Sequence, residues 1–254
     1  MEAARRNWQR LGFTLTPMGR HTGWGTANHA ITFQDDYLAL IGITNPEMPL
    51  PGRLRDALKV REGMFAIALA TDDADAAHAT LVANGLEPGD VLDMARDVEI
   101  PGQAEPARPR FRIIQLPETS TPNLDISLTQ HLTPELVWRP EWQEHPNGAT
   151  GIQQITVSVS DPASMQAPYE RLFGPDCCSA DGGSLTVETG RGSIRFVRSN
   201  TSINRITGAE LIVRSLVEAR KILAENDIPF DPKEDQILIL GDHANGVELT
   251  FTET

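Results

Sequence analysis

Polar and apolar residues alternate in the segment 124–131, near the middle of the chain. Asp125, Ser127, Thr129 and His131 are the polar residues at its alternate positions. Successive side chains of a strand point to opposite faces, so we expect these four on one face and the apolar residues against helices. An imidazole can act as a general base near neutral pH. We predict His131 and Asp125 as catalytic residues and Ser127 and Thr129 as substrate-binding ones; the alternative is a solvated sheet face with a structural histidine.

A glycine-rich segment near the N-terminus, residues 19–28, supplies a second group of candidates. It contains His21, Trp24, Thr26 and Asn28. Glycines permit tight turns and a close approach of the backbone to a ligand. We therefore predict that these four side chains contact a substrate, the alternative being a hairpin held together by Thr26 and Asn28.

Composition excludes several classes of partner. The chain has 254 residues, with 35 Asp and Glu against 22 Lys and Arg, and a formal charge of −13. That charge repels phosphate backbones and anionic lipid, so neither nucleic acid nor a membrane is an expected partner. No run of eighteen apolar residues is present, and no glycine-rich strand-to-helix fingerprint predicts a nucleotide cofactor.

The cysteines indicate a compartment. Cys177 and Cys178 are the only two and are adjacent, so they cannot join distant segments. The N-terminal residues lack the apolar stretch of a signal peptide. The sequence favours a cytoplasmic protein.

A strand–helix–strands unit recurs along the chain. One copy begins with an apolar strand at 64–70, followed by a helix that starts after Asp73 and stops at Gly85. A second begins at 207–213, where Ser215 can cap the following helix. A third begins with the alternating segment 152–160. These repeats predict an α+β fold of βαβββ units.

A fourth copy, at the N-terminus and therefore the first along the chain, lacks its opening strand. Residues 2–10 form its helix, and the preceding strand would lie before Met1. We therefore predict four units paired into two half-barrel domains, at 1–131 and 151–254, joined by a linker at 132–150. The open sheet edge left by the incomplete unit favours a homodimer.

Paired βαβββ units resemble the vicinal oxygen chelate superfamily of glyoxalases, bleomycin-resistance proteins and dioxygenases. The segments 19–28, 36–41, 130–135 and 145–148 look like those of the glyoxalase-like domain family. The resemblance implies a small-molecule ligand in the concave groove of each half-barrel.

The resemblance also implies a divalent metal, Zn, Mn, Ni or Fe, held by His or Gln and Glu on the first and last strands of a unit. Carried over position by position, the ligand set is incomplete, because Ala39 stands where a Glu is usual. The candidate ligands are Asp125, His131, Gln154 and Glu248. Gln154 belongs to another polar stripe, which could equally be a domain interface.

Three functions follow as hypotheses. The leading one is a glyoxalase-like enzyme with lyase or isomerase chemistry by proton transfer in the N-terminal groove. The second is a non-catalytic protein that sequesters a small molecule, as bleomycin-resistance proteins do. The third is an oxidoreductase that resembles the extradiol dioxygenases.

Overall fold

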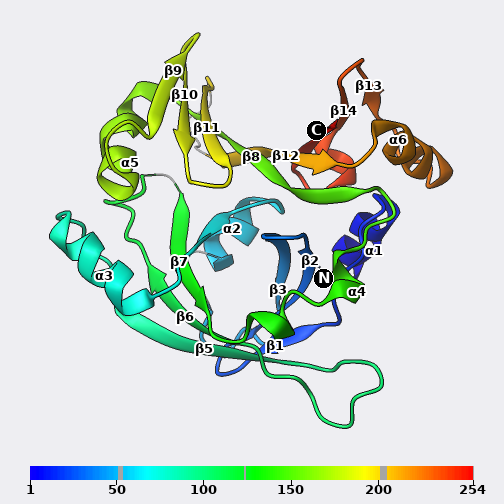
Figure 1. Ribbon diagram of the computed structural model, residues 1–254, viewed down its shortest axis with the longest axis horizontal. Coiled ribbons are helices and arrows are strands. Elements are labelled where there is room, and N and C mark those ends of the chain that lie inside the picture. Colours follow the sequence, from blue (N-terminus) through cyan, green and yellow to red (C-terminus); the bar gives the residue numbers. More distant parts are fainter. Residues whose placement is uncertain (51–53, 123, 201–204, 254) are drawn as a thin grey trace.

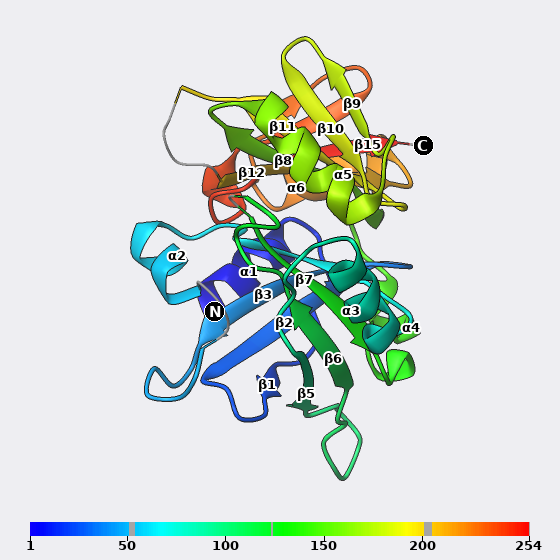
Figure 2. The ribbon, with the colours of Figure 1, turned by 90° about the vertical axis from the view of Figure 1, so that its left-hand side faces the viewer.

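Two curved sheets, one from each half of the chain, dominate the computed structural model, which describes residues 1–50, 54–122, 124–200 and 205–253 (Figures 1 and 2). The first sheet has seven strands: β1 (Gly19–His21), β2 (Thr26–Thr32), β3 (Tyr37–Ile43), β4 (Ala66–Ala70), β5 (Val91–Val98), β6 (Arg110–Gln115) and β7 (Asp125–His131). The second has eight: β8 (Ala149–Val159), β9 (Cys178–Asp181), β10 (Ser184–Glu188), β11 (Ser193–Arg198), β12 (Arg205–Val213), β13 (Asp231–Pro232), β14 (Gln236–Ile239) and β15 (Glu248–Glu253).

Six α-helices accompany the sheets in the described ranges: α1 (Glu2–Arg10), α2 (Leu54–Val60), α3 (Ala74–Ala83), α4 (Pro140–Gln143), α5 (Gln166–Phe173) and α6 (Leu216–Glu225). Two of them begin at the predicted caps. The side chain of Asp73 accepts hydrogen bonds from the backbone of the first turn of α3, and that of Ser215 does the same for α6. Short 3-10 turns lie at Pro134–Leu136, Pro162–Met165 and Gly241–His243.

The predicted repeat and fold class are confirmed. In the three complete units the opening strand lies parallel to the last strand, as the pairs β4·β7, β8·β11 and β12·β15 show. The first unit contributes α1 and then β1, β2 and β3. Sequence patterns missed several elements, among them the strand β5, the short strands β1, β9 and β13, and the helix α2, which lies between the first two units. In β5 the charged residues Asp93, Arg96 and Asp97 interrupt the apolar alternation.

The two sheets join their units differently. In the second sheet the opening strands β8 and β12 pair with each other at the centre, in the order β13-β14-β15-β12-β8-β11-β10-β9. In the first sheet the order is β3-β2-β1-β5-β6-β7-β4, so the units meet through β1 and β5. The strands β3 and β4 are therefore the two edges of the first sheet.

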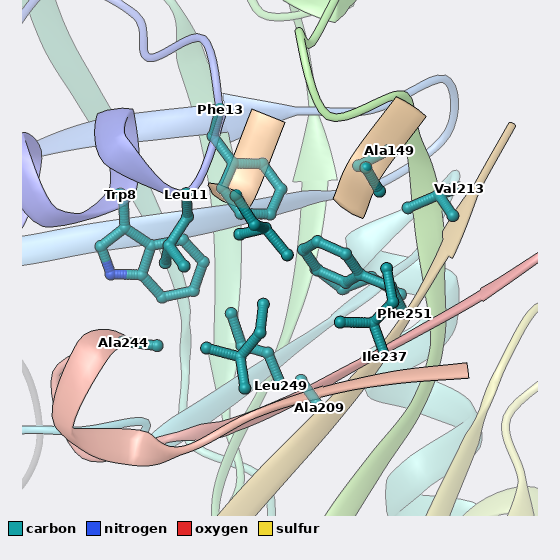
Figure 3. Packing of buried hydrophobic residues seen from close by; sticks show 14 of the residues in the cluster. Trp8, Leu11, Phe13, Ala149, Ala209, Val213, Ile237, Ala244, Leu249 and Phe251 are labelled. Atoms are coloured by element: carbon teal, nitrogen blue, oxygen red, sulfur yellow. The ribbon is translucent and has the colours of Figure 1, made fainter. Parts of the chain in front are cut away.

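Both large hydrophobic clusters contain residues from both halves of the chain. One brings Trp8, Leu11 and Phe13, around the end of α1, against Leu249 and Phe251 of β15 (Figure 3). The other joins the side chains beneath α3 to those around α5. Helices next to one sheet are thus partly buried against residues of the other half, and this burial stabilises the placement of the two sheets relative to each other. The strands up to β7, which ends at His131, form the first sheet, and those from β8, which begins at Ala149, form the second, while both hydrophobic clusters are shared between the halves.

The segment 132–150 is tightly held. His145 accepts a hydrogen bond at Nδ1 from the backbone of Thr14 and donates from Nε2 to the carbonyl of Thr32. Asn147, fully buried, donates to the carbonyl of Leu11. This segment therefore anchors the first unit to the start of the second sheet. None of the helices in the described ranges has the length and apolarity needed to cross a bilayer.

Candidate active site in the N-terminal groove

A connected cavity of about 1590 Å³ covers one face of the first sheet. Its lining comes from β3, β5, β6 and β7, together with α1, α2 and parts of the second sheet, and it extends around the β4 edge to α3. Five of the predicted site residues line it: His21, Asn28, Ser127, Thr129 and His131. These five residues therefore lie along the groove of the N-terminal half.

Strand register arranges the central side chains in a row across the sheet. His131 of β7 lies opposite Phe111 of β6. Arg96 of β5 lies opposite His21 of β1, and its guanidinium carbon is 5.6 Å from the centre of the Phe111 ring. Asn28 of β2 lies opposite Gly19 of β1. Four histidine, arginine and asparagine side chains from different strands thus share one surface.

Arg96 is the central charge of this row. Its side chain is 5% exposed, and one guanidinium nitrogen donates a 2.8 Å hydrogen bond to Oδ1 of Asn28. Its Nε has no hydrogen-bond partner. Burial lowers the pKa of Arg96, but an arginine remains protonated in proteins. The site therefore carries one buried positive charge.

His131 lies in an aromatic cage. Its ring centre is 4.7 Å from that of Trp138, 5.2 Å from that of Phe111 and 5.8 Å from that of Tyr37. Its Nε2 is 3.3 Å from the hydroxyl oxygen of Tyr37. Burial, with a smaller effect of the Arg96 charge, lowers the pKa of His131 to about 4. The imidazole is therefore neutral at physiological pH.

His21 resembles His131 in its charge state. Its Nδ1 is 2.8 Å from the hydroxyl of Thr26. Burial first, and then Arg96, lower the pKa of His21 to about 4. Thr26 does not line the cavity, and its hydroxyl contacts the His21 ring instead. Trp24 lies half-buried in the turn between β1 and β2, also outside the cavity lining.

Asp125 does not lie in the same place as His131. The two residues stand six positions apart on β7, which is roughly 20 Å along an extended strand. Asp125 accepts a hydrogen bond from the side chain of Gln115 and does not line the cavity. The predicted catalytic pair is therefore not brought together.

The candidate metal ligands are also dispersed. Gln154 on β8 donates a hydrogen bond to the Ser193 hydroxyl, and Glu248 is exposed on β15. In the groove, the two histidines flank the Arg96 guanidinium, which repels a cation, and Ala39 occupies the usual carboxylate position on β3. No group of three or more His, Cys, Asp or Glu residues suited to a metal ion occurs in the described part of the chain. These residues do not fit the divalent metal of the superfamily.

Sequence reasoning missed Arg96, Tyr37, Phe111 and Trp138 as site residues. The signal available for Arg96 was its position between Met94 and Val98, which share its face of β5. An arginine in an apolar stripe indicates either a buried ion pair or a ligand contact. Nothing in the sequence indicates that Trp138, from the linker, meets His131.

Comparisons with known proteins agree with this architecture. A family model described as a glyoxalase-like domain matches residues 1–173. A search of curated proteins found no match.

Solved structures share the fold. A hypothetical protein from Staphylococcus aureus superposes with a TM-score of 0.70 at 13% identity, over 95% of this chain and 91% of that one. A xylose isomerase-like TIM barrel/4-hydroxyphenylpyruvate dioxygenase fusion protein superposes with a TM-score of 0.62 at 13% identity, over 99% of this chain and 46% of the fusion protein. A mutant of 4-hydroxymandelate synthase from Streptomyces coelicolor superposes with a TM-score of 0.58 at 12% identity, over 100% of this chain and 89% of the synthase.

These identities are low enough that the structures establish the fold alone. The fold and the family model together confirm the predicted resemblance to the vicinal oxygen chelate superfamily. Because the family model matches more than half of its residues, the chain belongs to the glyoxalase-like domain family.

Proposed function

We propose that this protein is a glyoxalase-like enzyme that performs lyase or isomerase chemistry by proton transfer on a small molecule in the N-terminal groove. The observation that carries the proposal is the Tyr37–His131 pair, whose hydroxyl oxygen and Nε2 are 3.3 Å apart beside the cavity. Paired proton donors and acceptors at the wall of a pocket are typical of general acid–base catalysis.

The charge states of the pair define its chemistry. Burial raises the pKa of Tyr37, so the phenol keeps its hydrogen, while His131 is neutral. The phenol can then donate to Nε2, which leaves the ring hydrogen on Nδ1. When the Tyr37 oxygen takes a proton from the carbon next to a substrate carbonyl, the electron pair of that C–H bond stays on the substrate as an enolate, and the phenolic hydrogen moves to Nε2. His131 is then the imidazolium, and the reverse transfer through Tyr37 returns a proton to the substrate. No step requires Asp125 or a metal ion.

The second candidate is a non-catalytic binding protein, and the low proton affinity of His131 favours it. An imidazole with a pKa of about 4 is a weak base. Under this alternative the same groove, with Ser127 and Thr129 on its wall, holds a ligand without changing it.

Under either candidate we propose that the protein is cytoplasmic and forms a homodimer through the open sheet edges. The dioxygenase alternative has only the fold in its support.

Deuterium exchange separates the two candidates. A panel of small oxo and hydroxy carbonyl compounds would be incubated with the protein in D₂O and followed by NMR. A proton-transfer enzyme incorporates deuterium next to the carbonyl, and we expect His131→Ala to lower that rate by roughly 10²–10⁴-fold. His78→Ala, on α3 and outside the cavity lining, is the matched control. An exchange rate in His131→Ala equal to that of the wild type would refute the catalytic role.

A further inference from the structure

We propose that the N-terminal groove binds a small monoanionic organic acid, with its carboxylate on Arg96 and an apolar or aromatic body against Phe111 and Trp138. This inference rests on the proposed function for the location of the site, and it adds the chemical class of the ligand.

The first argument is the unbalanced charge of Arg96. A guanidinium that is 5% exposed normally faces a carboxylate, because an unpaired charge is expensive to bury. In the described ranges the hydrogen-bond acceptor of the Arg96 side chain is the neutral amide of Asn28, and the Phe111 ring lies beside the guanidinium. A neutral amide and a ring face offset only part of that cost. An anion from solution would supply the missing charge.

The second argument is an excess of hydrogen-bond donors. Nε of Arg96 and Nε1 of Trp138 are both buried without a partner, and both residues line the same cavity. Buried donors in folded proteins almost always have an acceptor. Two residues of the cavity wall thus each carry an unpartnered donor, and a ligand with more than one acceptor oxygen, such as a carboxylate, would supply partners.

The size of the charge favours a carboxylate over a phosphate ester. The nearby titratable groups are His21, His131 and Tyr37, and all three are neutral at physiological pH because burial opposes their charged forms. Arg96 is therefore the single charge of the row. One guanidinium matches one negative charge, and carboxylates pair with arginine through two parallel hydrogen bonds.

The surroundings of Arg96 define the remainder of the ligand. Phe111 and Trp138 flank His131 with ring centres 5.2 and 4.7 Å from its own. Met94, Ile41 and Ala39 extend the apolar lining. Aromatic and aliphatic walls favour an apolar body, such as a phenyl ring, over a sugar or a polyamine.

The test compares an acid with its neutral isostere. Sodium phenylacetate and phenylacetamide would be titrated into the full chain, with binding followed by isothermal calorimetry and by ligand-observed NMR. We expect phenylacetate to bind at least roughly tenfold more tightly, since a charge-assisted pair is stronger than a neutral hydrogen bond. Equal affinity for the two probes, or binding of neither, would overturn the proposal.

Two variants assign the preference to Arg96. Arg96→Met should abolish the preference for the acid. Arg20→Met is the control: it removes the same unit of charge from an exposed position on the neighbouring strand β1, and the preference should remain. A preference that survives in Arg96→Met would also overturn the proposal. Circular dichroism and thermal unfolding check that the variant folds.

A readout on His131 covers the case in which Arg96→Met does not fold. In the wild-type protein, phenylmethanesulfonate, an anion that stays ionised at pH 4, should neutralise Arg96 and raise the pKa of His131, measured by NMR titration of the ring, whereas phenylacetamide should not. This NMR titration detects binding and does not depend on catalytic turnover. Absence of deuterium exchange with an intact acid preference would refute only the proposed function, and loss of the preference with intact exchange would refute only this inference.

Discussion

The guanidinium of Arg96 donates a hydrogen bond to Oδ1 of Asn28 directly beside Gly19, where no side chain stands between them. A Cβ atom at Gly19 would lie 2.9 Å from Cδ of Arg96 and 3.0 Å from Oδ1 of Asn28. The glycine of the N-terminal motif therefore makes space for the charge at the centre of the groove.

Gly19→Ala should displace Arg96 and weaken binding of phenylacetate while the fold is kept. The added methyl group is too close to two side-chain atoms, and such overpacking costs about 1–3 kcal/mol of stability. Calorimetry and urea unfolding measure both effects. Gly151→Ala is the control, since a Cβ there meets only Asp36 at 3.7 Å. Unchanged phenylacetate binding in Gly19→Ala would contradict the role given to this glycine.

The stability of the protein should fall as the pH falls from about 6.5 to about 4. His21 and His131 have folded pKa values of about 4 against 6.5 for an ordinary histidine, so the unfolded chain binds protons in this range that the folded protein does not. After allowance for solvent screening, each contributes roughly 1–2 kcal/mol. Urea midpoints at pH 7 and pH 5 measure the loss.

His131→Gln should reduce that loss without abolishing it, because burial also lowers the pKa of His21 and of His145, which keep their contributions. His78→Gln should leave it unchanged. Asp36 has the opposite effect, since burial raises its pKa to about 6, so the decisive comparison uses the Asp36→Asn variant. A urea midpoint of that variant that is the same at pH 7 and pH 5 would be inconsistent with neutral imidazoles at His21 and His131.

Asp36→Asn should stabilise the protein at pH 8 and do little at pH 4. Burial, as the largest cause, raises the pKa of Asp36 to about 6, and its Oδ2 accepts a hydrogen bond from the backbone of Ile152. The stability linked to this group is fully present below pH 3.8 and is lost as the pH rises through about 6. Asn keeps an acceptor for Ile152 without the charge. The gain at pH 8 is roughly 1–3 kcal/mol.

Thermal unfolding at the two pH values tests this prediction. Asp231→Asn, at an exposed position on β13 of the second sheet, is the matched control. Equal effects of Asp36→Asn at pH 4 and pH 8 would show that Asp36 has an ordinary pKa.

An added strand in front of Met1 should stabilise the first sheet. Both β3 and β4 are sheet edges, and the cavity lining includes residues of each. In the second sheet the opening strand β12 lies parallel to β15 and antiparallel to β8. Met1 packs against Gly42 near the end of β3, which matches the position of the strand-to-helix link in the other units. A strand joined there would lie between β3 and β4.

The extension to test is a copy of residues 205–215, which contains β12 and its link to α6. New ladder hydrogen bonds worth about 2 kcal/mol in total would raise Tm by roughly 4–8 °C in a chain of this size. Hydrogen exchange should also slow at the outer amides of β3 and β4. The same extension with prolines at alternate positions cannot donate to the ladder and serves as the control. Equal Tm values for the two extensions would show that the edges do not accept a strand.

The sequence by itself determined the repeat, the caps and the family. Asp73 and Ser215 lie where their side chains can cap a following helix, and this local chemistry acts in any tertiary setting. Alternation on β7 also predicted an apolar face, and Leu124 and Ile126 are buried in the hydrophobic cluster beneath α3, because strand periodicity is a local property.

Only the tertiary structure decided which of these residues meet. His131 finds Tyr37 from β3 and Trp138 from the linker, and Arg96 finds Asn28 across the narrow strand β1. Those contacts depend on the pairing of β1 with β5, which joins the two units by a different edge from that used in the second sheet. Periodicity assigns a side chain to a face but not to a neighbour, since the order of strands in a sheet is set by long-range packing. For the same reason Asp125, on the predicted face, lies too far along β7 to share a reaction centre with His131.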